Sequence, residues 1–192
     1  MVDNIEKIKA LLSFESEDDF YFLQVLQRKK ENESTANRVI KSYFIKSMEH
    51  LDQVYDEVKQ LCELFHARAM IRLNKRSFYK TSFKALVNIS NALSNNDFKN
   101  VSKQYEKACG QYHNDSDKTW IVDIDGPVEE GFIKKIGEVI NTCAPEGEKV
   151  VTCLPSNSGW HLITKPFNLH RFKEFGYTLD IHKDNPTNLY IP

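Results

Sequence analysis

Two aspartates, two positions apart, carry the clearest chemical signal of the chain. The segment Trp-Ile-Val-Asp-Ile-Asp-Gly, residues 120–126, is apolar apart from Asp123 and Asp125, which is typical of a short buried strand. Because side chains alternate along a strand, both carboxylates should point to the same face. Two carboxylates this close repel each other unless a cation lies between them, so the pair predicts a site for Mg²⁺ or Mn²⁺. The alternative is a plain turn that ends the strand at Asp125-Gly126-Pro127.

Hydrophobic periodicity places this strand first in a β-α-β-β-α-β succession. The expected elements are a strand at 119–125, a helix at 128–143, strands at 149–154 and 160–164, a helix at 169–175 and a strand at 177–181. In this arrangement the first strand lies between the third and the fourth. We therefore expect Asp123 and Asp125 to share a sheet face with His161 and Asp180, and Asp184 is the alternative to Asp180.

The residues around His161 suit a phosphorylated ligand. His161 follows the turn 155–159, in which backbone N–H groups and the Ser158 hydroxyl can donate hydrogen bonds to a triphosphate. Lys165, a few residues downstream, could add a positive charge. Hard cations held by carboxylates share their coordination with substrate phosphates, so the whole set predicts metal-dependent phosphoryl transfer.

The first half of the chain predicts a separate αβ unit. The expected elements are a helix at 5–12, strands at 20–28 and 38–44, a helix at 51–65, a strand at 67–73, a helix after Ser77 and a short helix at 97–108. A helix is not excluded for 38–44, and residues 29–37 are expected to form a loop. Ser77 should cap the helix that carries Phe83, Leu86, Ile89 and Leu93 at helical spacing.

A basic cluster lies on the strand at 67–73 and the following turn, and it consists of Arg68, Arg72, Lys75, Arg76 and Lys80. Arg72, Lys75 and Arg76, followed by two aromatic residues, could contact a nucleic-acid backbone and stack on bases. A solvated basic edge is the alternative interpretation. The net charge of the 192-residue chain is −1, so any contact with nucleic acid must come from such a local patch.

The composition is that of an ordinary globular protein, with 41% hydrophobic and 28% charged residues. The N-terminal residues lack the apolar core of a signal peptide, and no apolar run is long enough to cross a membrane. The four cysteines show no Cys-x-x-Cys spacing, which favours reduced thiols. We therefore expect a cytoplasmic protein without a membrane partner.

Three segments together resemble the motifs of the archaeo-eukaryotic primases, in the order of that family. These segments are Trp-Ile-Val-Asp-Ile-Asp, Ser-Asn-Ser-Gly-Trp-His-Leu-Ile-Thr and Thr-Leu-Asp-Ile-His, at residues 120–125, 156–164 and 178–182. The resemblance covers about the last 75 residues by motif, and the first half only by its αβ character. Gly159 stands where the family often has serine, and the turn lacks the family's basic residues.

The resemblance implies an α+β fold of two lobes, an N-terminal αβ lobe at 1–115 packed on an RRM-like catalytic lobe at 116–192. It implies a minimal primase-polymerase core, a nucleotidyltransferase that uses Mg²⁺ or Mn²⁺, nucleoside triphosphates and a single-stranded DNA template. The setting would be DNA replication, of a phage or mobile element for example, with a separate helicase or replication protein as partner. Carried over, Asp123, Asp125 and Asp180 are the catalytic metal ligands. The nucleotide-binding residues are Ser156, Ser158, Gly159, His161 and Lys165.

Two other classes stay open. The same fold could serve as a nucleotide-binding or nucleic-acid-binding module without catalysis, or as a metal-dependent nuclease. Retention of all three acidic positions together with His161 favours the polymerase over the binding module, because a binding module has no need of mutually repelling carboxylates.

Overall fold

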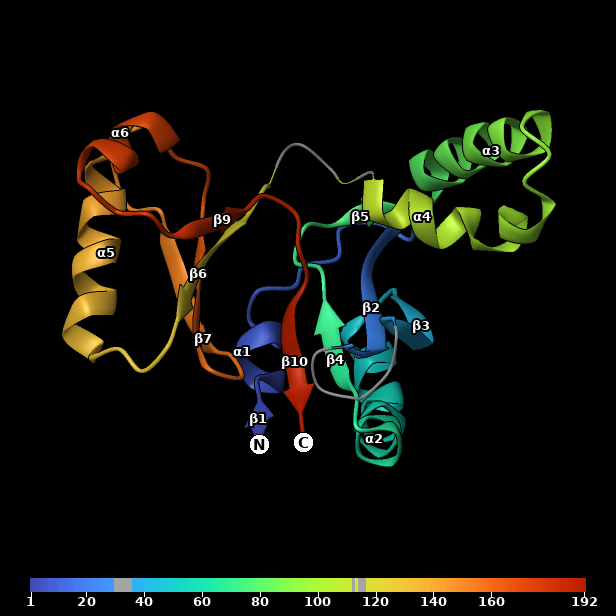
Figure 1. The fold of residues 1–192 in the computed structure, drawn as a ribbon, viewed down its shortest axis with the longest axis horizontal. Helices are drawn as coiled ribbons and strands as arrows, with labels where there is room; N and C mark the ends of the chain where they lie inside the picture. The colour runs from blue at the N-terminus through green and yellow to red at the C-terminus, as the bar shows by residue number, and fades with distance from the viewer. Residues whose placement is uncertain (30–35, 112, 114–116) are drawn as a thin grey trace.

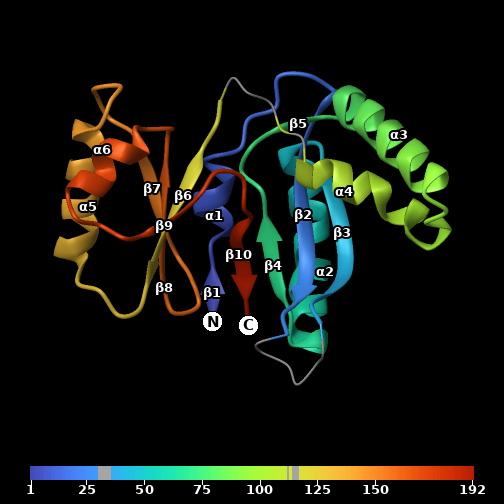
Figure 2. The same cartoon turned by 45° about the horizontal axis from the view of Figure 1, so that its top comes forward.

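The chain folds into two antiparallel sheets with helices packed on them, an α+β architecture as the sequence predicts (Figure 1). A computed structural model describes residues 1–29, 36–111, 113 and 117–192. Among these residues no helix is long and apolar enough to cross a membrane. The two sheets lie side by side along the long axis, with both termini at the same end of the first sheet (Figures 1 and 2).

The first sheet has the strand order β1-β10-β4-β2-β3, and the short strand β5 pairs with the end of β2. Its strands are β1 (Val2–Asp3), β2 (Asp19–Gln27), β3 (Arg38–Ile45), β4 (Arg68–Ile71), β5 (Arg76–Ser77) and β10 (Thr187–Ile191). The 38–45 segment, for which a helix was not excluded, is a strand paired with β2. Part of the expected loop 29–37 lies outside the described residues.

Helix α2 (Met48–Phe65) packs on the first sheet because its apolar side chains repeat at helical spacing. Leu51, Val58 and Cys62 of α2 are completely buried among apolar residues of β2 and β4. Ser47 caps the helix by accepting a hydrogen bond from the His50 N–H. The short helix α1 (Ile5–Lys9) lies beside β10 and contributes Ile8 to the same core.

A helical projection follows β5. It consists of α3 (Phe78–Ser94), the 3₁₀ helix η1 (Phe98–Lys103) and α4 (Gln104–Gln111). Ser77 caps α3 as expected, accepting a hydrogen bond of 3.0 Å from the Lys80 N–H. The projection extends from the first sheet away from the second one (Figures 1 and 2).

The second sheet has the order β7-β8-β6-β9, with every neighbouring pair antiparallel. Its elements are β6 (Trp120–Asp125), α5 (Glu130–Thr142), β7 (Val150–Pro155), β8 (Gly159–Thr164), α6 (Leu169–Glu174) and β9 (Asp180–His182). Strand β6 therefore lies between β8 and β9, the neighbours that the β-α-β-β-α-β order predicts. Strand β9 begins later than expected, at Asp180.

Alternation along β6 gives the second sheet two different faces. Val122 and Ile124 pack under α5 and α6 in one apolar core, whereas Ile121 joins the core of the first sheet. The face that carries Ile121 also carries Asp123 and Asp125, so the aspartates point toward the first sheet. The lobes are thus joined at one end of β6 and leave a cleft at the other.

The last strand changes the expected division at residue 116. Strand β10 belongs to the first sheet, where it pairs with β1 and β4, and not to the lobe assigned to residues 116–192. The chain crosses from β9 back to the first sheet between His182 and Thr187. Residues from this return segment can consequently take part in both lobes.

Candidate functional site

The aspartate pair lies at the open end of β6, on the face that looks into the cleft. Asp123 is directly opposite His161 on β8, and Asp125 is opposite Gly159. The Asp123 side chain is 26% exposed, and Asp125 is exposed. Both carboxylates can therefore reach a ligand in the cleft, as the alternation of the sequence predicted.

His161 is held between the two lobes. Its Nδ1 lies 2.8 Å from the Thr187 hydroxyl oxygen, and its Nε2 lies 3.6 Å from Asp123 Oδ1. Burial lowers the pKa of His161 from its ordinary value, and the charges of His182 and Arg68 lower it further, against the opposing effect of Asp123. His161 is therefore neutral near pH 7. A carboxylate only accepts hydrogen bonds, so the neutral ring is expected to carry its proton on Nε2 and to accept the Thr187 hydroxyl proton at Nδ1.

A second histidine, His182, is part of the same site. It stands opposite Ile121 in the β6–β9 register, and its Nε2 lies 3.8 Å from Asp123 Oδ2. Asp123 thus has one histidine near each carboxylate oxygen. His182 is the last residue of the third motif, but it was not predicted as a site residue. Its position two residues after Asp180 would put both side chains on one strand face.

Two glycines lie at the same end of the β6–β8 pair as the aspartates. A Cβ at Gly159 would lie 2.0 Å from the Ile124 carbonyl oxygen, so only glycine allows the two strands to approach this closely. Gly126 adopts a φ of +86°, and its N–H donates to the Ser158 carbonyl at 2.8 Å. The glycine at 159 therefore has a structural reason.

The turn between β7 and β8 borders the cleft as expected. Ser156, Asn157 and Ser158 line it together with Asp123 and Asp125. The Ser156 N–H is already used, because it donates to the Gly159 carbonyl at 2.9 Å. The side chains of the turn, more than its backbone, are thus the groups that can contact a ligand.

The two candidates for the third carboxylate have different surroundings. Asp180 is opposite Asp123 in the β6–β9 register, so its Cβ points to the same face, and its side chain is exposed. Asp184 is instead bound by Arg72 and Arg76. The geometry therefore favours Asp180, although it is not among the described residues that line the cleft.

The opposite wall of the cleft belongs to the first sheet and is basic. Arg68 on β4 and Arg28 just after β2 line the cleft across from the aspartates, beside Met70 and Leu26. Asn188 on β10 also lines it; this residue is 2% exposed, and its Oδ1 has no hydrogen-bond partner among the described residues. The cleft holds about 320 Å³, within the range of small-molecule sites.

Arg28 and Arg68 were not predicted as site residues, although strand alternation offers a signal for Arg68. Arg68 and Met70 alternate with buried residues on β4, and Arg68 pairs with Leu26 on β2. Nothing in the sequence indicates, however, that this face of β4 meets the face of β6 that carries the aspartates.

The donor set of the cleft fits a hard divalent cation in part. Asp123 and Asp125 supply carboxylate oxygens, the ligands that Mg²⁺ and Mn²⁺ prefer. Within the described ranges, no three His, Cys, Asp or Glu side chains are grouped so as to hold one ion. Mg²⁺ is commonly bound by one or two carboxylates and completed by substrate phosphates and water, and the aspartate pair is compatible with that mode.

The three residues predicted to bind nucleic acid are engaged in the protein itself. Arg76 is fully buried and donates to Asp184 Oδ2 at 2.7 Å and to the Cys109 carbonyl at 2.7 Å. Arg72 also pairs with Asp184, at 3.3 Å. Lys75 is 7% exposed and pairs with Glu15 and Asp19. These side chains form ion pairs within the protein. Their positions therefore fit neither the predicted nucleic-acid contact nor the alternative of a solvated basic edge.

Lys165 is another residue that the structure does not bring to the cleft. It follows the far end of β8, where Thr164 pairs with Trp120, whereas the aspartates lie at the end that pairs with Gly159. Its N–H donates to the Lys149 carbonyl, and its side chain borders a different cavity that includes Lys75 and Lys118. Lys165 and His161 are close in sequence and were therefore expected to lie together. They are separated because Lys165 lies beyond the end of β8 that points away from the aspartates.

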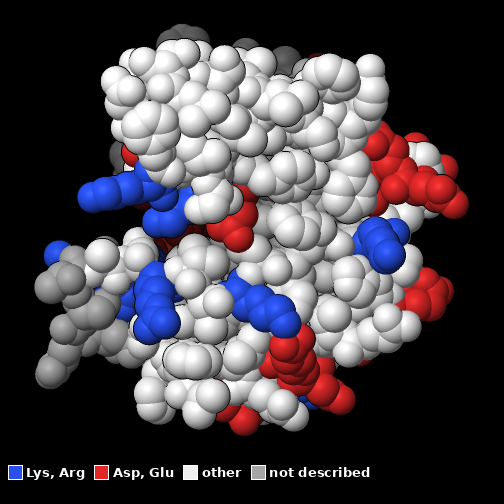
Figure 3. All heavy atoms as spheres, turned by 90° about the vertical axis from the view of Figure 1, so that its right-hand side faces the viewer, with Lys and Arg blue, Asp and Glu red and all other residues white. Residues whose placement is uncertain are grey.

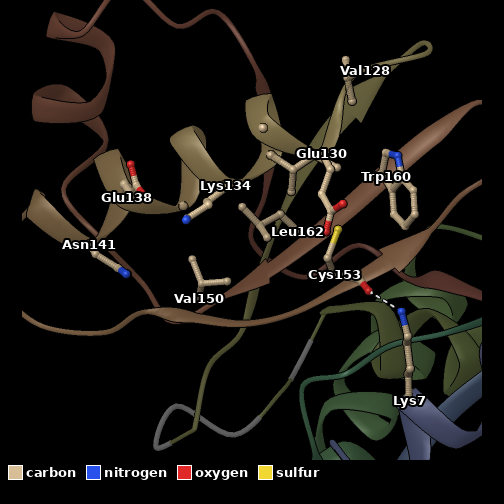
Figure 4. Close-up of a pocket in the computed structure, with 13 residues that line it drawn as sticks. Lys7, Val128, Glu130, Lys134, Glu138, Asn141, Val150, Cys153, Trp160 and Leu162 are labelled. Atoms are coloured by element: carbon tan, nitrogen blue, oxygen red, sulfur yellow. Dashed lines mark hydrogen bonds between the residues drawn. The ribbon is translucent and has the colours of Figure 1, made fainter.

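A larger cavity of about 930 Å³ lies on the other face of the second sheet, between α5 and strands β7 and β8 (Figure 4). Trp160 and Leu162 face it because they alternate with His161. The Lys7 ammonium group donates to the Cys153 carbonyl at its edge. Its surface is mainly apolar, and its charged residues are Lys7 on α1 and Glu130, Lys134 and Glu138 on α5. The aspartate cleft, which combines paired strand carboxylates with His161, is therefore the stronger candidate site.

Comparison of the chain with models of known protein families, with curated proteins and with solved structures found no match.

Proposed function

We propose that the protein is a metal-dependent nucleotidyltransferase, a template-directed primase or polymerase of the archaeo-eukaryotic primase type. The observation that carries the proposal is the charge arrangement of the cleft. One wall presents Asp123 and Asp125, the other presents Arg28 and Arg68, and His161 is fixed between the two lobes. A metal-bound triphosphate has the complementary pattern, with cations toward the aspartates and anionic oxygens toward the arginines.

The aspartates have the role of binding the metal. Asp123 and Asp125 would hold Mg²⁺ or Mn²⁺, with Asp180 as the third carboxylate from the neighbouring strand. When bound, the metal would neutralise the phosphates and polarise the phosphorus that is attacked. The exposed position of Asp125 lets it meet a cation that arrives with its nucleotide.

The role of His161 follows from its protonation state. A neutral imidazole with its proton on Nε2 donates one hydrogen bond toward the cleft, and Thr187 keeps the ring from turning. A phosphate oxygen placed near Nε2 would accept that bond and favour the protonated ring. His182, near the other oxygen of Asp123, keeps that carboxylate oriented.

The remaining groups of the cleft would recognise the rest of the nucleotide. Arg28 and Arg68 supply fixed positive charge for the triphosphate, and the hydroxyls of Ser156 and Ser158 donate hydrogen bonds to it. The unpartnered Oδ1 of the buried Asn188 suits a hydroxyl or amino group of the sugar or base. Leu26 and Met70 offer apolar surface beside it.

The proposed substrates are nucleoside triphosphates and a single-stranded DNA template, in the replication of a phage or other mobile element with a separate helicase as partner. All four cysteines are free, which suits the reducing cytoplasm that we propose as the compartment.

The experiment is an extension assay with Mn²⁺ or Mg²⁺, a single-stranded template and labelled nucleotides. We expect template-dependent products from the wild type and from Asp56→Asn, which changes a carboxylate with 84% exposed side chain on α2, and none from Asp125→Asn. Products that persist in Asp125→Asn would overturn the proposal. Degradation of the template would identify a nuclease, and nucleotide binding without any product would identify a binding module.

A further inference from the structure

An ordinary surface helix buries its large apolar side chains, whereas helix α3 exposes them. Its buried residues are small or polar, namely Thr81, Ala85, Asn88 and Ala92. This inner face packs against α4, where the Asn88 amide donates to Gln111 at 3.0 Å. The attachment of the helix therefore uses little of its apolar surface.

The large apolar side chains of α3 point to solvent. The outer stripe, as we name it, consists of Tyr79, Phe83, Leu86, Val87 and Leu93, with exposed fractions of 66%, 55%, 60%, 53% and 46%. Their spacing of three, four or seven residues places them along one side of the helix. The Tyr79 and Phe83 rings contact each other edge to face, with centroids 4.8 Å apart.

An uncovered stripe of this kind is uncommon on a monomer. With aromatic side chains of about 150–250 Å² and somewhat smaller aliphatic ones, the exposed fractions amount to roughly 500–600 Å² of apolar surface. One partner of a standard protein interface buries about 800 Å², so the stripe with its polar margin has the size of an interface half. The upper part of the molecule in Figure 3, over α3 and its neighbours, shows a broad face without lysine, arginine, aspartate or glutamate.

We propose that the outer stripe is the interface of a two-fold symmetric dimer, in which the α3 helices of two copies pack antiparallel. A stripe without acidic residues has nothing to repel its own copy at the centre of the contact. The helix carries Lys80 and Lys84 in its first half and no charged residue in its second half. Antiparallel packing places these lysines near the C-terminal end of the partner helix, where the helix dipole is negative.

The same features argue against single-stranded nucleic acid as the occupant. Stacking platforms combine aromatic rings with a basic groove, whereas three of the five residues of this stripe are aliphatic and α3 itself carries two lysines, Lys80 and Lys84. The position of the helix is also compatible with an active dimer. The projection points away from the second sheet, so pairing through α3 leaves the aspartate cleft open (Figures 1 and 2).

The test is sedimentation velocity of the full chain over a range of concentrations, with single substitutions. We expect the wild type to form dimers, and Leu86→Glu to raise the dissociation constant more than tenfold, because two acidic groups would be buried near the symmetry axis. Leu64→Glu is the matched control. Leu64 is 72% exposed on α2, so its replacement should leave the dimer unchanged.

A wild type that remains monomeric at high micromolar concentration overturns the proposal, as does a dimer that Leu86→Glu leaves intact or that Leu64→Glu disrupts equally. A monomer whose sedimentation changes only when a single-stranded oligonucleotide is added overturns it as well, and reassigns the stripe to nucleic acid. Circular dichroism of both variants should match the wild type, since each replaced side chain is exposed.

Discussion

Replacing Asp184 by asparagine removes the counter-charge of two arginines that link the lobes. Asp184 lies in the return segment between β9 and β10, and Arg72 and Arg76 lie after β4 in the first sheet. Its Oδ2 accepts from both arginines, and its Oδ1 accepts from the Asn74 amide at 3.1 Å. Asparagine keeps the shape of the side chain, so the variant tests charge without creating a cavity.

The size of the effect follows from burial. Arg76 is fully buried, and the side chains of Arg72 and Asp184 are 20% and 16% exposed. Breaking a buried ion pair by removing one partner costs about 3–5 kcal/mol, and the residual exposure here suggests the lower end. At roughly 2–4 °C per kcal/mol for a chain of this length, Asp184→Asn should lower the melting temperature by about 6–12 °C.

The assays are thermal and chemical unfolding followed by circular dichroism, with Asp56→Asn as control. Asp56 forms an exposed surface ion pair with Lys59, so its replacement should change the free energy of unfolding by less than about 0.5 kcal/mol. An Asp184→Asn variant as stable as this control would refute the assignment of Arg72 and Arg76 to an internal ion-pair network.

The same variant addresses the nucleic-acid alternative. If Arg72 and Arg76 contacted DNA phosphates, loss of their counter-charge would tighten binding of an oligonucleotide and steepen its salt dependence. Because Arg76 is fully buried and the Arg72 side chain is only 20% exposed, we expect the affinity of the folded variant to equal that of the wild type. Tighter, more salt-dependent binding would return these residues to a nucleic-acid interface.

Three further predictions follow from local geometry and charge. Gly159→Ala should destabilise the protein by about 1–3 kcal/mol in urea unfolding and lower nucleotide affinity, since its Cβ would push β8 away from β6; wild-type stability would contradict the close approach. Partial burial of Asp19 acts to raise the pKa of its carboxyl group. Hydrogen bonds from backbone N–H groups and from Lys75 outweigh this effect, so the pKa of Asp19 is lowered. Its contribution to stability is therefore present above about pH 4 and is lost as the pH falls through the lowered pKa, so Asp19→Asn should destabilise at pH 7 and not near pH 2 in pH-dependent urea unfolding; an equal loss at both pH values would contradict it. Burial raises the pKa of the Cys62 and Cys109 thiols to about 12, so neither should react with iodoacetamide at pH 8 until the protein is unfolded, as peptide mass spectrometry would show.

The sequence predicted the strand order of the second sheet and the placement of its acidic residues because these signals are local. Alternation within β6 was enough to place Asp123 and Asp125 on one face, and the element order was enough to place His161 beside them. The end of β9 was less certain. The three-residue segment Asp180-Ile181-His182 fits several registers, and the pairing of Ile121 with His182 shows that the histidine belongs to the cleft.

The basic residues were misassigned because residue type does not reveal burial. Arg76 owes its burial to Asp184, which is 108 residues away and has no local signal. The arginine that reaches the cleft, Arg68, was predicted only as part of the same basic cluster. Which arginine faces the aspartates depends on how the two sheets pack, and strand alternation alone does not determine that.

Helix α3 and strand β10 illustrate the same limit. The spacing of Phe83, Leu86 and Leu93 correctly predicts a helix, but the side that is buried is the one with small residues, because α4 packs there. Strand β10 belongs to the first sheet because it pairs with β1 and β4, and both of these strands are remote from it in sequence.

The central claim is that the cleft between the sheets binds a metal nucleotide through the aspartate pair. Its most direct test is calorimetric titration with Mn²⁺ and a non-hydrolysable deoxynucleoside triphosphate, applied to the wild type, Asp123→Asn, Asp125→Asn and Asp56→Asn. We expect binding by the wild type and Asp56→Asn, and affinity lowered at least about tenfold in each cleft variant, since each loses a charged ligand. Equal affinity in all four proteins, or no binding by the wild type at millimolar nucleotide, would contradict it.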